Sequence, residues 1–325
     1  MTLGRCPPLV SAYNIACLKP IPASKPTATF DKFSRAIARR AAIRSADTDC
    51  LRLVDGAPDG FPDLLIDDFA NRWLIQTRGH DLPDWARQLF EPRSVYWKRL
   101  DQTNKEPPAH IAGEVIAEPF LAKENGLKYV IDFAAGYSQG IFLDQRDNRR
   151  QVRDLSSGTE VLNLFSYTCA FSVCAAAGGG HSVSVDLSRP ALEWGKRNFE
   201  ANGFDPNGHE FIVGEAADWL RRFGKKGRKF DLIIIDPPTF SRDKKGKVFR
   251  VERDFGKLSG AAMQLLRGHG TLLCTTNQRS LSRGAFQSLI LDAAEDPRAW
   301  KLQHAVMPPD FTGEPYLKTC WVTRR

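Results

Sequence analysis

The sequence predicts an α/β protein in which a doubly wound, mostly parallel sheet follows a smaller α+β domain. From about residue 146 onward, short β-branched and apolar segments alternate with segments of helical periodicity. Such alternation is typical of βαβ units, which bind ligands at the carboxyl ends of their strands. The length of 325 residues also exceeds the roughly 100 to 200 residues of a typical domain, and this favours two units.

The first part of the chain reads as a leader and a small domain. Residues 1–29 contain five prolines, so we expect an extended or flexible leader. The small α+β domain is expected over residues 30–125, with helices at 30–44 and 81–90, strands at 50–56, 64–69, 72–77 and 94–100, and a polar loop at 101–108. Two β-rich halves around Gly136 and Gly140 then predict a β-hairpin over residues 126–145 that joins the domains.

The larger domain is expected over residues 146–325. Its predicted strands lie at 161–165, 182–187, 210–213, 230–236 and 270–276, with another at the WVT segment near the end. Its predicted helices lie at 169–177, 189–201, 215–223, 252–267 and 283–294.

The amino-acid composition shows which classes of protein are compatible with this sequence. A net charge of +8 and a pI near 9.2 are compatible with a polyanionic partner, but an evenly spread surplus of charge would serve solubility equally well. No window approaches the ~18 apolar residues of a membrane helix, and no secretory signal pattern is present. The seven cysteines include no C-x-x-C pair, so we expect free thiols in the cytoplasm and no metal site.

Three strand ends carry the predicted chemistry. Asp186 ends the second strand of the larger domain, where a carboxylate commonly binds ribose hydroxyls; a helix-capping role is equally compatible. The turn after the first strand, residues 166–170, lacks G-x-G-x-x-G, which disfavours NAD and FAD. Strand four ends in Asp236-Pro237-Pro238-Thr239-Phe240, where two prolines fix the backbone; a simple proline-terminated strand is the alternative.

These residues resemble a known family. LNLFSYTCAFSV, SVDLSRPALEWGKRNFEANGF and FDLIIIDPPTFS are similar to class I S-adenosylmethionine-dependent methyltransferases that act on large-subunit ribosomal RNA. DPPTFSRDKKG, FRVERDFGKL, TTNQR and YLKTCWV look closest to the branch that methylates guanine N7 in 23S rRNA, and the related 5-methylcytosine enzymes are also similar. The resemblance covers the chain from about Phe30 and implies a Rossmann-like fold, S-adenosylmethionine as cofactor and RNA, or its precursor particle, as partner.

The resemblance also assigns roles by position. It implies a reacting centre made of Asp236, Pro237, Pro238 and Phe240. Asp236 is implied to bind the cofactor as well. The other implied cofactor-binding residues are Phe142, Asp144, Arg146, Asn163, Phe165, Ser166, Tyr167, Thr168, Asp186, Leu187, Glu215 and Ala216. The expected substrate-binding residues are Thr239, Phe240, Lys244, Lys245, Lys247 and Asn277. Cys169 departs from the family pattern, which has glycine at this position. If the turn at 166–170 needs positive φ or close approach of its backbone to the cofactor, we expect the cysteine to shift it.

The sequence leaves several alternatives for the atom that is methylated. Cytosine-C5 methylation needs a nucleophilic cysteine, but the stretch at the end of strand five reads Thr275-Thr276-Asn277-Gln278, and Cys274 lies inside an apolar strand. Guanine N7 already carries a lone pair and needs no general base, so we favour it. An exocyclic-amine methyltransferase and an RNA-binding protein without catalysis are the alternatives. The basic run 242–250 follows strand four and suits RNA phosphates, whereas the run 224–229 is expected at the opposite edge.

Overall fold

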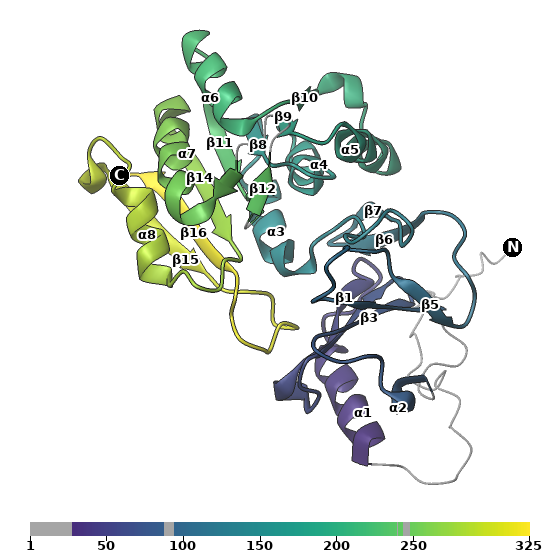
Figure 1. The fold of residues 1–325 in the computed structure, drawn as a ribbon. Coiled ribbons are helices and arrows are strands. Elements are labelled where there is room, and N and C mark those ends of the chain that lie inside the picture. Colours follow the sequence, from purple (N-terminus) through teal and green to yellow (C-terminus); the bar gives the residue numbers. More distant parts are fainter. Residues whose placement is uncertain (1–27, 88–93, 239, 243–247) are drawn as a thin grey trace, which may run out of the picture.

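The N-terminal part of the protein is a five-stranded sheet covered by a helix. The computed structural model describes residues 28–87, 94–238, 240–242 and 248–325 (Figure 1). The sheet runs in chain order through β1 (Cys50–Asp55), β2 (Leu64–Phe69), β3 (Arg72–Thr77), β4 (Ser94–Arg99) and β5 (Ala109–Ala112). Its strands pair antiparallel except β3 and β4, which are parallel. The helix α1 (Ala28–Arg40) buries Phe33 and Ala36 against this sheet, and α2 (Asp84–Arg87) follows β3.

The predicted position of the connecting hairpin is wrong. The hairpin pairs β6 (Phe120–Glu124) with β7 (Leu127–Ile131), and the turn at Asn125 and Gly126 has positive φ at both residues. The predicted second half forms no strand; it contains only the 3-10 helix η3 (Leu143–Gln145). Gly140 has φ +120°, and a Cβ there would lie 2.5 Å from the Val130 carbonyl oxygen, so this glycine serves close packing and not a hairpin turn.

The larger domain confirms the predicted fold class. Its seven strands lie side by side in the order β10 (Glu210–Val213), β9 (His181–Asp186), β8 (Glu160–Leu164), β11 (Phe230–Ile235), β14 (Leu266–Thr276), β16 (Lys318–Arg324) and β15 (Trp300–Ala305). The first five strands are parallel, and β16 is antiparallel to both of its neighbours. Chain order reverses direction beside β8, and this is where doubly wound sheets bind ligands.

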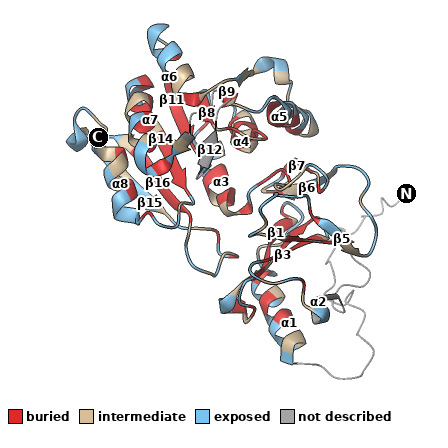
Figure 2. Cartoon of the chain, in the orientation of Figure 1, coloured by how far each residue is buried: buried red, intermediate tan, exposed pale blue. Residues whose placement is uncertain are grey.

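Helices cover both faces of this sheet (Figure 1). On one face lie α3 (Arg146–Asp154), α4 (Ala170–Ala177) and α5 (Arg189–Ala201); on the other lie α6 (Ala216–Lys225), α7 (Val251–Leu265) and α8 (Arg283–Leu291). Alternate residues of β11 serve the two cores, since Ile234 packs with the first group and Ile233 with the second. Figure 2 shows the resulting layer of buried strands between the helices.

Several elements differ from the prediction. The first helix ends at Arg40 and not at 44, and α3, β5 and β15 were not predicted. The two ends of the basic run 242–250 belong to a small hairpin, in which β12 (Phe240–Arg242) pairs with β13 (Val248–Arg250). The helix expected at 81–90 is observed at 84–87, and residues 88–93 lie outside the described residues. The described residues also contain the short 3-10 helices η2 (Ala57–Asp59), η4 (Pro206–Gly208) and η5 (Pro297–Ala299).

The segment of residues 306–317 connects the two domains. It leaves β15, reaches the N-terminal sheet and returns to β16 (Figure 1). The fully buried carboxylate of Asp310 accepts hydrogen bonds from the Arg146 guanidinium and from the Arg52 backbone N–H, the latter at 2.9 Å. The Arg40 guanidinium donates to the Asp310 carbonyl oxygen at 2.9 Å and pairs with Asp59. We call residues 306–317 the interdomain strap.

Within the described ranges, no helix is long and apolar enough to span a membrane.

Candidate active site

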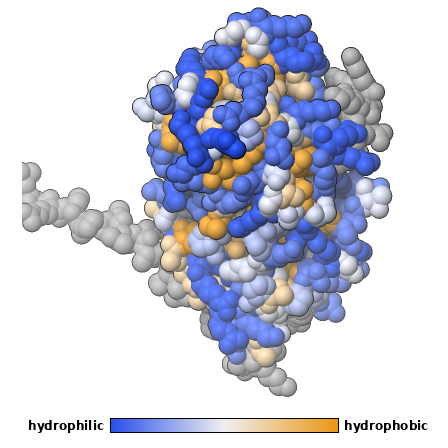
Figure 3. All heavy atoms as spheres, turned by 90° about the vertical axis from the view of Figure 1, so that its left-hand side faces the viewer, coloured by the Kyte–Doolittle hydropathy of each residue, from blue (hydrophilic) through white to orange (hydrophobic). Residues whose placement is uncertain are grey.

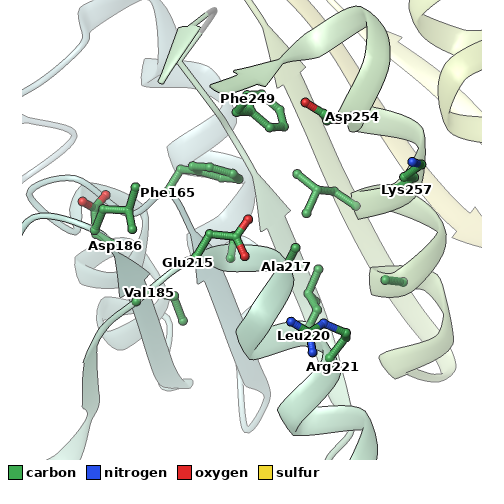
Figure 4. A pocket seen from close by; sticks show the side chains of 15 residues that line it. Phe165, Val185, Asp186, Glu215, Ala217, Leu220, Arg221, Phe249, Asp254 and Lys257 are labelled. Carbon is green, nitrogen blue, oxygen red and sulfur yellow. The ribbon is translucent and has the colours of Figure 1, made fainter. Parts of the chain in front are cut away.

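A mostly apolar pocket of about 250 Å3 opens beside the carboxyl ends of β8, β9 and β10 (Figure 4). It brings together five predicted cofactor-binding residues from three strand ends: Phe165, Asp186, Leu187, Glu215 and Ala216. Helices α6 and α7 close the other side with Leu220, Lys257, Leu258 and Ala261. The Phe249 ring, contributed by β13, lies 5.6 Å from the Phe165 ring at the same pocket.

Asp186 organises the turn beside this pocket. Its carboxylate oxygens accept the backbone N–H groups of Tyr167 and Ser188, each at 2.8 Å. Burial raises the pKa of Asp186, and these backbone donors oppose the rise. The carboxylate therefore fixes the turn after β8, and Asp186 is also one of the residues that line the pocket.

The turn after β8 is held in an unusual backbone conformation. Phe165, Tyr167 and Cys169 all have positive φ, at 56°, 46° and 59°. The Thr168 hydroxyl donates to the Gly140 carbonyl oxygen at 2.5 Å, and the Asn198 amide donates to the Thr168 carbonyl oxygen at 2.9 Å. Since positive φ is costly for residues with a Cβ, these tertiary contacts are needed to maintain the turn.

Cys169 occupies its left-handed position because α5 leaves room for it. The Cys169 side chain is fully buried, and a Cβ added to Gly195 would lie 2.4 Å from its Sγ. A cysteine that packs against a glycine on the neighbouring helix thus stands where the resemblance implies a glycine. Positive φ at this position is retained, so the turn keeps the backbone conformation that glycine would provide.

A second group of polar side chains lies at the carboxyl end of β11. The Thr275 hydroxyl donates to the partly buried Asp236 carboxylate at 2.5 Å, and the Gln145 side chain also hydrogen-bonds to it. Burial raises the pKa of Asp236 to about 6, and the nearby charge of Asp144 adds to the rise. Asp144 in turn accepts a 2.9 Å hydrogen bond from the Tyr316 hydroxyl of the interdomain strap, and burial raises its pKa.

Other predicted site residues have different surroundings. The Arg146 guanidinium is buried against Asp310, so its charge has a buried partner within the protein. The Asn163 amide is buried in β8 and donates to the Ser172 hydroxyl at 2.9 Å, and Ser166 and Thr168 are buried in the turn that follows β8. The Phe142 ring is half exposed and lies 5.6 Å from the Tyr167 ring.

The DPP motif and the expected RNA-binding residues are only partly described. Pro237 is buried, Pro238 is exposed, and Asn277 is exposed after the end of β14. Phe240 begins β12, but its side chain lies outside the described side chains. Thr239, Lys244, Lys245 and Lys247 lie outside the described residues.

Sequence reasoning did not select four side chains that the fold brings to these sites. Phe249 lines the pocket, and Gln145, Thr275 and Tyr316 surround the two carboxylates. Gln145 directly follows Asp144, and Phe249 is the one aromatic residue of the basic run 242–250, so both had a local signal. Tyr316 had none, because 172 residues separate it from Asp144.

The described cysteines are poorly suited to nucleophilic chemistry. Cys50, Cys169, Cys174, Cys274 and Cys320 are free and buried, as the prediction of free thiols expects. Burial raises the pKa of Cys169 to about 12 and that of Cys274 well above its ordinary value, so both stay protonated. The described part of the chain also contains no group of three or more His, Cys, Asp or Glu side chains placed to hold a metal ion.

Together, the sheet order, the acidic end of β9 and the apolar pocket define a class I methyltransferase fold. Comparison with known proteins agrees. The chain belongs to the S-adenosylmethionine-dependent methyltransferase family, whose model matches residues 95–315.

Two curated relatives are similar over most of the chain. Ribosomal RNA large subunit methyltransferase I of Aeromonas salmonicida is 35% identical over 75% of this chain and 65% of its own length. Ribosomal RNA large subunit methyltransferase K of Neisseria meningitidis is 31% identical over 80% of this chain and 73% of its own length. The chain thus spans slightly under two thirds of the length of the Aeromonas relative.

A solved structure supports the same fold and cofactor. SMU.776, a protein named as a methyltransferase and crystallised in complex with SAH, superposes with a TM-score of 0.81 at 28% identity. The match covers 90% of this chain and 80% of that one. The similarity therefore includes both domains and not the seven-stranded sheet alone.

Proposed function

We propose that this protein transfers a methyl group from S-adenosylmethionine to guanine N7 of large-subunit ribosomal RNA. The observation that carries the proposal is the Asp236 carboxylate, which lies at the end of β11, the strand next to the pocket-forming end of β8. The names of the relatives support large-subunit rRNA as the substrate class. The choice of N7 rests on the chemistry of the side chains around Asp236.

The pocket suits the adenosine part of the cofactor. Phe165 and Phe249 provide aromatic surface for a flat purine, and Asp186 stands at the rim, where a ribose would present two hydroxyl donors. Glu215 borders the same space at the start of α6, where its carboxylate accepts the Asp218 backbone N–H at 2.9 Å. Apolar walls with carboxylates at the rim match the chemistry of adenosine, so the residues present fit the cofactor.

Asp236 is placed to stabilise positive charge during the transfer. When bound, S-adenosylmethionine supplies a methyl group on a positively charged sulfonium. The guanine N7 lone pair forms the new N–C bond, the S–C electron pair returns to sulfur, and the positive charge moves to the base. The hydrogen bonds from Thr275 and Gln145 hold the Asp236 carboxylate in place, so it stabilises that positive charge without moving during the reaction. No proton needs to be removed from the base.

The buried thiols argue against the cytosine-C5 alternative. Methylation at C5 requires a thiolate to add to the ring before the methyl can be accepted. Cys274 lies in β14 with its side chain fully buried, and Cys169 is packed against Gly195. Neither thiol is exposed at the Asp236 edge, so the described cysteines offer no nucleophile for a base.

Identification of the labelled nucleoside tests the proposal. The protein is incubated with labelled S-adenosylmethionine and in vitro transcribed large-subunit rRNA, which is digested and separated by chromatography. We expect label in 7-methylguanosine, and Asp236→Ala should lower the rate by about 100- to 1,000-fold. Label in 5-methylcytidine or in an N-methylated exocyclic amine would refute N7, and label absent from RNA would refute the whole proposal.

Activity should depend on the protonation of Asp236. Its raised pKa of about 6 means that the carboxylate is charged above that pH and becomes neutral below it. We therefore expect the single-turnover methylation rate to fall as pH decreases through about 6. Asp144→Asn removes a neighbouring negative charge and should move this decline to lower pH. Rates that stay constant from pH 8 to 5 in both proteins would contradict the role of Asp236.

Asp186→Ala should weaken cofactor binding. The change removes a charged acceptor from the pocket rim and two backbone hydrogen bonds from the turn after β8. A hydrogen bond to a charged group contributes about 1.5 to 3 kcal/mol, so calorimetry with S-adenosylhomocysteine should show a Kd raised by about 10- to 100-fold. Asp205→Ala is the matched control, because Asp205 also accepts a backbone N–H but caps η4 before β10. Equal affinity of Asp186→Ala and wild type would exclude Asp186 from the cofactor site.

A further inference from the structure

Three cationic side chains gather at the sheet edge that carries Asp236. Lys318 is the first residue of β16 and pairs with Thr276, the last residue of β14. Arg279 follows β14, and Arg283 is the first residue of α8. We call Arg279, Arg283 and Lys318 the basic cluster. None of the three belongs to the basic run 242–250 that the sequence associated with RNA.

Positive charge in the basic cluster exceeds the negative charge that faces it. Lys318 is largely buried and donates to the Gln278 carbonyl oxygen at 2.7 Å; burial and the nearby Arg279 lower its pKa, and Arg283 adds to this effect. Among the described residues only Glu314 forms an ion pair with the cluster, at 2.6 Å from Arg279, and its side chain is 75% exposed. Glu252 accepts hydrogen bonds from the neutral Gln278 and Ser280 side chains of the same loop.

This arrangement costs free energy in the absence of an anion. Like charges repel each other, most strongly where a partly buried ammonium is involved. Arg283 also stands in the first turn of α8, where the helix dipole disfavours a cation. A bound polyanion would reverse both penalties.

The basic cluster is adjacent to the reaction centre. The Arg279 guanidinium lies over the Tyr316 ring, 5.1 Å from its centre, and the Tyr316 hydroxyl donates to Asp144 beside Asp236. Hydrophilic residues also predominate on the face that contains α8 and β15, with smaller apolar patches between them (Figure 3). A nucleic acid whose base reaches Asp236 therefore has its backbone within reach of these cations.

We propose that the basic cluster binds backbone phosphates of the RNA next to the methylated nucleotide. The inference rests on the proposed function only in taking RNA as the substrate; it is independent of which atom is methylated. Arg283 and Arg279 supply the exposed donors, and Lys318 adds a charge whose position is fixed by its bond to the Gln278 carbonyl. Phosphate contacts of this kind position a substrate without reading its sequence.

The test compares charge removal at the two edges of the sheet. Arg279→Gln with Arg283→Gln removes two exposed charges from the cluster, and Lys225→Gln with Lys226→Gln removes two exposed charges from the end of α6 as a matched control. The Kd for in vitro transcribed large-subunit rRNA is measured by filter binding between 50 and 300 mM salt, values chosen as roughly the range over which phosphate contacts are sensitive. The Kd for S-adenosylhomocysteine is measured in parallel.

We expect the cluster variant to bind RNA about tenfold more weakly and to reduce the slope of log K against log salt by about 1 to 2. The control should retain the wild-type slope, and cofactor affinity should be unchanged in both variants. Wild-type RNA affinity and slope in the cluster variant, or an equal loss in the control, would overturn the phosphate site while leaving the proposed function intact. Failure of the wild-type protein to bind RNA would overturn both.

Discussion

Asp310→Ala is expected to lower the free energy of unfolding by about 3 to 5 kcal/mol. The change leaves the Arg146 guanidinium, which is 4% exposed, without its buried counter-charge. It also removes the acceptor of the Arg52 backbone N–H. A buried charge that loses its partner retains its full desolvation cost, whereas an exposed pair can be broken with little effect.

Urea denaturation checks this expectation, with Glu193→Ala as the control. Glu193 forms an exposed pair with Lys196 on α5, and its loss should cost less than about 1 kcal/mol. Asp310→Asn should be intermediate, since the amide oxygen still accepts one hydrogen bond while the charge is lost. If Asp310→Ala unfolds at the wild-type urea concentration, the strap does not stabilise the domain interface.

Gly195→Ala is expected to disturb the cofactor turn from the opposite side of the packing contact. The new Cβ would lie 2.4 Å from the Cys169 Sγ and 2.9 Å from its Cβ, both too close for carbon and sulfur to remain in place. Overpacking of this kind costs about 1 to 3 kcal/mol. Because Cys169 ends the turn that contains Tyr167 and Thr168, the Kd for S-adenosylhomocysteine should rise together with the loss of stability.

A double-mutant cycle separates this contact from a general defect in α5. Cys169→Gly removes the side chain that meets the new Cβ and provides a residue suited to positive φ. Gly195→Ala should therefore be tolerated in the Cys169→Gly protein, with a coupling free energy of at least about 1 kcal/mol. An equal cost of Gly195→Ala in both backgrounds would show that another neighbour, and not Cys169, requires the glycine.

The sequence predicted those helices and strands that are stabilised by residues close together in the chain. The helix expected at 189–201 is observed with the same bounds, because Ser188 caps its first turn and Pro190 suits its start. The helix α3 was missed because its sequence, RDNRRQVRD, has a single apolar residue. Its position depends instead on buried long-range contacts such as the ion pair of Arg149 with Glu124, in which both side chains are at most 2% exposed. Such pairs depend on residues that the sequence does not place side by side.

The same distinction applies to the site. Asp186 and Asp236 could be found because Asp186 ends one strand and Asp236 directly follows another, and the ends of parallel strands meet at one edge. The environment of Asp236 could not be predicted from the sequence, because its parts come from distant segments. These are Gln145 before α3, Thr275 of β14 and, through Asp144, Tyr316 of the strap. The buried ion pair of Arg146 could not be predicted for a related reason: its counter-ion Asp310 lies 164 residues further along the chain.

The interdomain strap also has a consequence for the protein during its synthesis. The partners of Arg40 and Arg52 at Asp310 are made 270 and 258 residues later. At translation rates of about 5 to 20 residues per second, the N-terminal sheet waits roughly 10 to 50 s for these contacts. During that time the Arg40 guanidinium has its Asp59 partner within the domain, but the Arg52 backbone N–H lacks its Asp310 acceptor. Completion of the N-terminal domain is therefore expected to be among the last events of folding, after translation has passed residue 310.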